Sequence, residues 1–110
     1  MTIRRFQVRW TEQAVADLEG IVGWIALDSP ANAWTWFRKL KRKALTLQGL
    51  PNRGRVVPEL LKIGIRSYRE LVVGPYRIVY RSEGRMVWVL GVLDARRDLE
   101  DLLLERMLRI

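Results

Sequence analysis

The side chains that could do chemistry in this chain are arginines, lysines, tyrosines and carboxylates. Its 110 residues include 20 Lys and Arg, 12 Asp and Glu and three Tyr, but neither His nor Cys. Histidine is the commonest general base near neutral pH, and His and Cys are the usual zinc ligands. We therefore expect no metal centre, no disulfide and no cofactor. Any catalysis would rest on phosphate-binding cations and on proton transfer by tyrosine or carboxylate groups.

The most suggestive of these groups lie in the second half of the chain. Glu70 belongs to one strand-like segment and Arg77 to the next. A carboxylate base beside a phosphate-binding arginine is one interpretation of this pair. The other is a cross-strand ion pair on an exposed sheet face, which would contribute only about 0.2–1 kcal/mol to stability.

The apolar pattern predicts the elements that must position these groups. Alternation over 3–10 predicts a half-buried strand, and stripes at helical spacing behind caps at Thr11 and Ser29 predict helices over 12–28 and 30–49. Segments 65–73, 76–81 and 86–93 are rich in β-branched and aromatic residues and predict a three-stranded antiparallel meander. Residues 50–65 contain Pro and Gly and predict a loop. A final helix over 99–110, capped by Asp98, completes the pattern.

These elements predict an α+β fold with the order βααβββα. A helical hairpin would pack on one face of an antiparallel sheet that includes the N-terminal strand. The length fits a single domain over residues 1–110, and 49% apolar content with five Trp excludes a disordered chain. The absence of Cys and of any long apolar run near the N-terminus predicts a cytoplasmic protein without membrane contact. The net charge of +8 favours acidic or nucleic-acid partners.

Several short segments occur together in a fixed order along nearly the whole chain. They are Trp10-Thr11, Gly54-Arg55-Val56-Val57-Pro58, Tyr68-Arg69-Glu70-Leu71, Gly74-Pro75-Tyr76-Arg77-Ile78 and Asp94-Ala95-Arg96-Arg97. Each segment alone is common, but the set resembles the RelE/ParE superfamily, the toxins of type II toxin-antitoxin systems. The resemblance implies the α+β fold described above.

RelE-type members of this superfamily cut mRNA in the ribosome. They use two lysines on the second strand, an arginine on the third, an arginine after the fourth and a tyrosine in the tail. Arg77 and Arg96 match the two arginines. The lysine positions fall on Tyr68 and Glu70, and the tail tyrosine position falls on a leucine, 102 or 103. These departures favour the ParE branch over the ribonuclease branch.

ParE-type members poison DNA gyrase by trapping it on cleaved DNA, and they act by binding rather than by catalysis. The resemblance implies gyrase, on DNA, as the target, and a hetero-oligomer with a ParD-like antitoxin. We expect the target to contact Tyr68, Arg77, Arg81, Arg96 and Arg97. An apolar groove for the antitoxin is expected at Trp24, Trp34 and Trp36. The alternative is a metal-independent, ribosome-dependent mRNA endonuclease with Glu70, Arg77 and Arg96 as its catalytic residues.

Structural roles compete with several of these functional assignments. The Arg96-Arg97 pair could instead bond to Asp94 and Asp98, and the three tryptophans could belong to the core. Tyr76 and Tyr80 are expected in the core, with their hydroxyls at its rim. The charge alone would also suit a general nucleic-acid binder, but no helix-turn-helix, zinc or RNA-binding signature supports that class.

Overall fold

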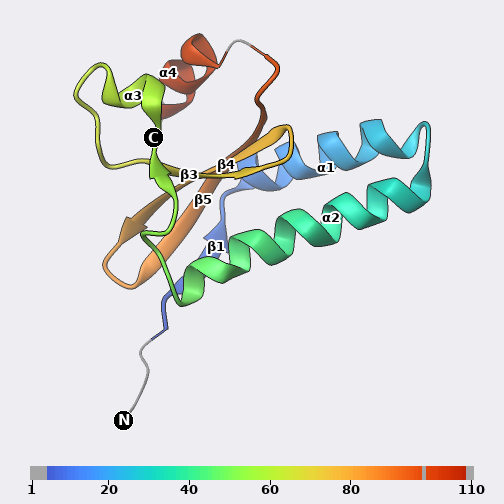
Figure 1. The fold of residues 1–110 in the computed structure, drawn as a ribbon, viewed down its shortest axis with the longest axis horizontal. Coiled ribbons are helices and arrows are strands. Elements are labelled where there is room, and N and C mark those ends of the chain that lie inside the picture. The colour runs from blue at the N-terminus through green and yellow to red at the C-terminus, as the bar shows by residue number, and fades with distance from the viewer. Residues whose placement is uncertain (1–4, 98, 109–110) are drawn as a thin grey trace.

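The computed structural model describes residues 5–97 and 99–108, and it confirms the predicted α+β fold (Figure 1). The predicted Asp98 cap lies outside the described residues. The elements are β1 (Gln7–Trp10), α1 (Glu12–Ala26), α2 (Pro30–Leu45), the 3-10 turn η1 (Thr46–Gln48), β2 (Arg55–Val56), α3 (Pro58–Leu61), β3 (Arg69–Val73), β4 (Tyr76–Glu83), β5 (Met86–Asp94) and α4 (Glu100–Leu108). The short β2 and α3 lie within the segment that was predicted to be a loop.

The five strands form one sheet in the order β1-β5-β4-β3-β2. Strands β3 to β5 form the predicted antiparallel meander, and β2, which was not predicted, pairs antiparallel with β3. Strand β1, however, pairs parallel to β5. The prediction of an all-antiparallel sheet was wrong for this strand. Turn sequences identify local hairpins, whereas β1 and β5 are separated by most of the chain and their relative direction leaves no local signal.

Two tight turns connect the last three strands. Gly74 and Gly84 are each the first residue of a two-residue loop, between Val73 and Tyr76 and between Glu83 and Met86. Their φ angles are +59° and +58°, which L side chains rarely adopt. Glycine at the first loop position is the signature of the type II′ hairpin turn, whose twist matches that of the strands.

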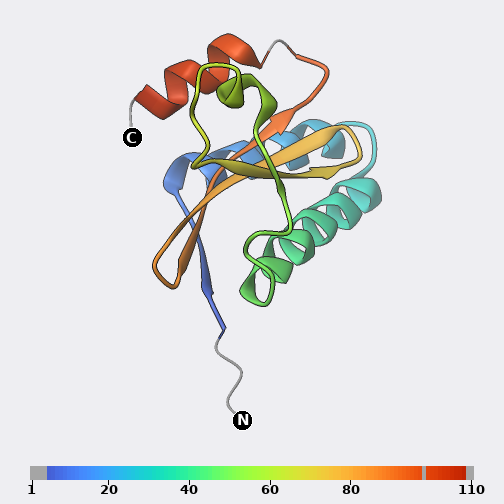
Figure 2. The same cartoon turned by 60° about the vertical axis from the view of Figure 1, so that its left-hand side comes forward.

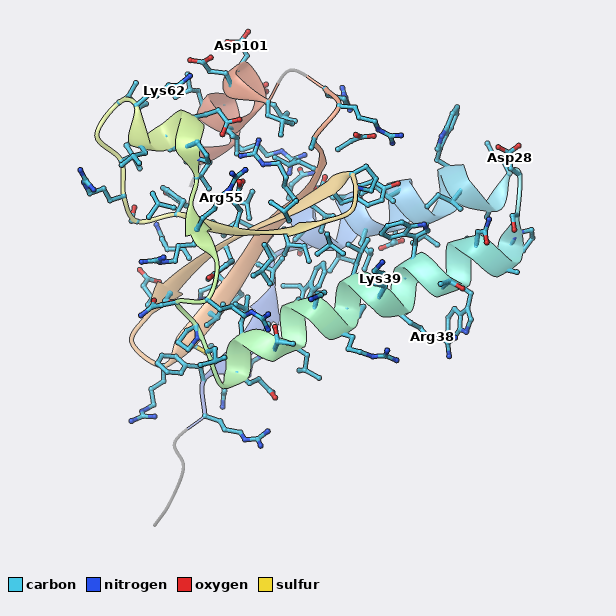
Figure 3. All side chains as sticks on the ribbon, viewed as in Figure 1. Asp28, Arg38, Lys39, Arg55, Lys62 and Asp101 are labelled. Carbon is cyan, nitrogen blue, oxygen red and sulfur yellow. The ribbon has the colours of Figure 1, made fainter. Side chains whose placement is uncertain are left out.

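The helical hairpin of α1 and α2 packs on one face of the sheet, as predicted. The side chains of Thr11 and Ser29 accept hydrogen bonds from the backbone N–H groups of residues 14 and 32, which fixes both helix starts. Helix residues such as Leu18 and Leu40 pack against Tyr76 and Tyr80, which are buried as predicted. Beyond this contact the hairpin extends past the sheet, and Asp28 lies at its far end (Figures 1 and 3).

The opposite face of the sheet is covered by α3 and α4. Figure 2 shows these two helices on one side of the sheet and α2 on the other. A second apolar cluster fills the interface and includes Leu60 of α3, Val79 of β4, Leu90 of β5 and Leu103 of α4. The predicted exposed sheet face is therefore wrong, because two short helices bury it. Within the described part of the chain, no helix has the length and apolar character needed to cross a membrane.

Candidate functional site

Arg77 and Glu70 meet as expected, but they do so inside the protein. They are 6% and 1% exposed. Arg77 binds both carboxylate oxygens of Glu59 on α3 at 2.7 Å, and its Nε donates to Glu70 at 2.7 Å. Arg55 of β2 donates to the other oxygen of Glu70, also at 2.7 Å. The four side chains form a closed network of two cations and two anions across β2, β3, β4 and α3.

This network uses the groups that a ribonuclease site would need. The guanidinium of Arg77 already binds two carboxylates, and both oxygens of Glu70 accept hydrogen bonds from arginines. Pairing with Glu59 and Glu70 raises the pKa of Arg77, whose charge is therefore permanent. The arrangement can hold α3 on the sheet, but it presents neither a free phosphate clamp nor an accessible base.

The network should make the fold sensitive to acid through Glu59. The side-chain hydrogen bonds from Arg77 lower the pKa of Glu59 below its ordinary value of 4.5. Because the folded pKa lies below the unfolded one, the stabilisation is complete above about pH 4.5 and is lost as pH falls through the folded pKa. We expect Glu59→Gln to be less stable than the parent protein at neutral pH, and the difference to shrink below about pH 4. Urea unfolding of both proteins across this pH range measures the difference in stability. A difference that does not change with pH would contradict the lowered pKa of Glu59.

A groove lies where the helical hairpin, the end of β5 and α4 come together. Two adjoining hollows of about 330 and 320 Å³ share Trp24, Tyr76 and Arg96 in their walls. We call the combined feature the Trp24 groove and define it by six residues: Trp24, Trp36, Tyr76, Arg96, Arg97 and Arg106. It combines large aromatic surfaces with three arginines, and Asp17, Asp28 and Asp94 also line it. Aromatic residues and arginine are enriched at protein interaction sites.

The aromatic wall of the Trp24 groove comes mainly from the hairpin. Trp24 is 75% exposed, although an indole of this size is usually buried. Trp36 is half-buried and packs edge-on against Tyr76, with ring centres 5.2 Å apart. The ammonium of Lys39 lies over this indole, 4.8 Å from the ring centre. The result is one rigid aromatic pair beside one large, freely accessible indole.

The arginines in the basic wall of the Trp24 groove differ in whether they form ion pairs. Arg96 forms two hydrogen bonds with Asp94, at 2.8 and 2.6 Å, and these lower the pKa of Asp94. This confirms the competing structural assignment for Arg96, whose side chain nevertheless remains exposed. Arg97 is exposed and forms no ion pair with any described residue. The rim of the groove therefore carries an exposed cation that has no ion-pair partner among the described residues.

Arg106 ties α4 to α1 across the open edge of β5. It donates to both oxygens of Asp17 at 2.7 and 2.8 Å, and Asp17 also accepts the backbone N–H of Val92 at 3.0 Å. A Cβ at Gly91 would lie 3.0 Å from the Arg106 guanidinium and 3.1 Å from the carboxylate of Asp17. The glycine therefore allows the two helices to meet here, and the contact forms the floor of the Trp24 groove.

The structure groups the predicted antitoxin-binding and target-binding residues differently from the sequence analysis. Trp24 and Trp36 share a groove with Arg96 and Arg97, although the first two were expected to bind the antitoxin and the others the target. Trp34 lies apart from them, 57% exposed and stacked on Phe37. The three tryptophans therefore do not line one groove.

Tyr68 and Arg81 lie at the opposite end of β4 from the Trp24 groove. Tyr68 is buried, and the guanidinium of Arg81 lies over its ring at 5.7 Å. Arg81 lies five positions after Tyr76 on β4, which corresponds to roughly 17 Å along a strand. The predicted target-binding residues therefore occupy two ends of the sheet, with the buried Arg77 between them.

The sequence pattern did not indicate the ion-pair partners that stabilise the Arg77 network and the Trp24 groove. Glu59 and Arg55 fell in the segment predicted to be a loop, and the link from Asp17 to Arg106 joins the first and last helices. A signal for α3 was present, because Pro58 followed by Glu59 is the usual start of a helix. No comparable local signal marks the link between α1 and α4.

Comparison with known proteins gives three concordant results. Residues 8–99 match the family model described as the ParE toxin of the type II toxin-antitoxin system, parDE. The chain is 37% identical over 92 residues to the Toxin RelE2 of Caulobacter vibrioides, covering 83% of this chain and 97% of that protein. It also shares its fold with a chain of the chromosomal ParDE TA system from P. aeruginosa, with a TM-score of 0.68 at 22% identity over 81% of this chain and 95% of that one.

Proposed function

The chain belongs to the ParE toxin family of type II toxin-antitoxin systems, and from this membership we propose that it arrests growth by binding and poisoning DNA gyrase. A ParD-like antitoxin would neutralise it in a hetero-oligomeric complex. In this proposal the protein acts on its target in the cytoplasm as a binder rather than as an enzyme. We expect gyrase that is treated with the protein to remain trapped on cleaved DNA.

The burial of Arg77 and Glu70 is the observation that favours gyrase binding over mRNA cleavage. A ribonuclease of this fold needs exposed cations to hold the phosphate and accessible groups to move protons. Here the candidate base is 1% exposed and the candidate phosphate ligand is bound to two carboxylates. Exposed cations and aromatic rings instead gather at the Trp24 groove, which suits recognition of another macromolecule.

The Trp24 groove is the surface on which we place the antitoxin. An antitoxin segment with acidic residues and one apolar stripe would complement it, since Arg97 and Trp24 are both exposed at this groove. Such a segment can fold on binding and lay its apolar side along the hairpin. Because Arg96 and Arg97 were assigned to the target, an antitoxin in this groove would neutralise the toxin by covering part of its target-binding surface.

The proposal is tested by adding the purified protein to gyrase and relaxed plasmid. We expect supercoiling to stop and linear DNA to accumulate after denaturation of the complexes. Primer extension on mRNA in a translating extract tests the alternative activity in parallel. Unaffected supercoiling at molar excess would refute the gyrase assignment, and new cleavage sites in the message would establish the ribonuclease instead.

A further inference from the structure

A second basic surface lies at the end of β4 that is remote from the Trp24 groove. It is a hollow of about 230 Å³, and we call it the Arg81 pocket. Every side chain in its wall is a cation or a neutral hydrogen-bonding group, and no described carboxylate lines it. The wall is formed by Asn52, Arg66, Ser67, Arg69, Tyr80, Arg81 and Ser82.

Arg81 is held in place but makes few hydrogen bonds. Its guanidinium lies over the ring of Tyr68, and its two hydrogen bonds, to Tyr68 and Glu83, are both 3.5 Å long. Its Nε is a buried side-chain nitrogen that has no hydrogen-bond partner among the described residues. Arg77, on the same strand, forms its contacts at 2.6–2.7 Å. Donors that are fixed in place but poorly satisfied are suited to a ligand that accepts hydrogen bonds.

The other donors of the Arg81 pocket are also available or well oriented. Arg66 is exposed and has no ion-pair partner among residues 5–97 and 99–108. Arg69 is fixed by a hydrogen bond of 2.7 Å to the carbonyl of Gly54, and the hydroxyl of Tyr80 accepts the N–H of the same glycine at 3.0 Å. Burial raises the pKa of Tyr80, so its hydroxyl keeps a proton that it can donate.

We propose that the Arg81 pocket binds a phosphodiester group of a nucleic-acid backbone. Three arginines around a small hollow match the charge and the acceptor geometry of a phosphate, to which guanidinium groups donate two parallel hydrogen bonds. Arg53, close enough to oppose the pKa shift of Tyr80 through its charge, adds a further exposed cation for an adjacent phosphate. A chain of phosphates uses these cations together, whereas a single free anion would use only the pocket.

The pocket is tested by DNA binding in the absence of gyrase, so its failure is distinct from failure of the proposed function. Anisotropy of a labelled duplex of about 20 base pairs is measured over a series of salt concentrations. The variant Arg66→Gln/Arg81→Gln is compared with Lys43→Gln/Lys62→Gln, which removes the same charge from exposed positions. Lys43 lies on α2, and Lys62 lies next to α3 (Figure 3). We expect the pocket variant to bind about tenfold or more weakly and to lose about two from the slope of log K against log salt. Equal losses in the two variants would overturn the pocket.

Two further measurements distinguish loss of the pocket from unfolding of the variant and from binding of a free anion. The single variant Arg66→Gln changes an exposed side chain without a described partner, so it should stay folded and still lose affinity by about threefold or more. Inorganic phosphate is titrated into the protein and the complex. Weak competition at millimolar phosphate fits a backbone site. Thermal protection by phosphate without any binding of the duplex would mean a site for a free anion and would overturn the proposal.

Discussion

Replacing Arg77 with alanine is expected to destabilise the fold by about 3–5 kcal/mol, because it leaves a buried carboxylate without its main partner. Glu70 has no exposed side-chain surface, and Glu59 loses both of its hydrogen bonds to the guanidinium. In a domain of this size such a loss corresponds to a fall of more than about 10 °C in melting temperature. Urea and thermal unfolding of the purified variant measure it.

Two variants separate a structural role of Arg77 from a role in target contact. Arg96→Ala removes an exposed arginine and should leave the stability nearly unchanged. The double variant Arg77→Met/Glu70→Met should regain part of the loss, because it leaves no buried charge unpaired at these two positions. If Arg77→Ala unfolds like the parent protein but has lost its toxicity, Arg77 contacts the target and the structural assignment fails.

Trp24→Ala is expected to weaken antitoxin binding by roughly 30-fold or more, the loss typical of an aromatic residue at the centre of an interface. The indole is 75% exposed in the free toxin, so its removal should leave the stability of the toxin nearly unchanged. Calorimetric titration with a ParD-like antitoxin that binds the parent toxin measures the affinity. The same partner should protect the fluorescence of Trp24 from an added quencher.

Trp34→Ala is the matched comparison on the same hairpin. Trp34 is also exposed, but it lies outside the Trp24 groove, stacked on Phe37. A partner confined to the groove should discriminate strongly between the two substitutions. Equal losses would mean that the antitoxin wraps both sides of α2, and an unchanged affinity for Trp24→Ala would remove the groove from the proposal.

Local patterns were sufficient to predict most of the elements of the fold. Thr11 and Ser29 mark the helix starts, and Gly74 and Gly84 mark tight turns, because each acts within a few residues of its own position. The parallel pairing of β1 with β5 was beyond such signals. It depends on contacts between distant segments, and the amphipathic pattern of a strand is the same in either direction.

The candidate site was harder to predict than the fold. The order of the strand-like segments placed Glu70 beside Arg77 correctly, but their burial depends on α3 and α4, which dock on the sheet through residues far away in sequence. Trp24 and Arg96 come from the first helix and from the segment after the last strand, and no spacing rule relates them. Tertiary packing therefore determines which side chains are accessible, and the residue types alone do not indicate this packing.

A stoichiometric titration tests whether this toxin acts on gyrase by binding. The purified toxin is added to a fixed amount of gyrase and plasmid, and the trapped cleaved DNA is quantified with the parent protein and with Arg96→Ala/Arg97→Ala. We expect cleaved DNA to rise until toxin and gyrase are roughly equimolar, as for a bound poison, and the double variant to require about tenfold more toxin. Supercoiling that continues at large molar excess, with no cleaved DNA, would contradict this expectation.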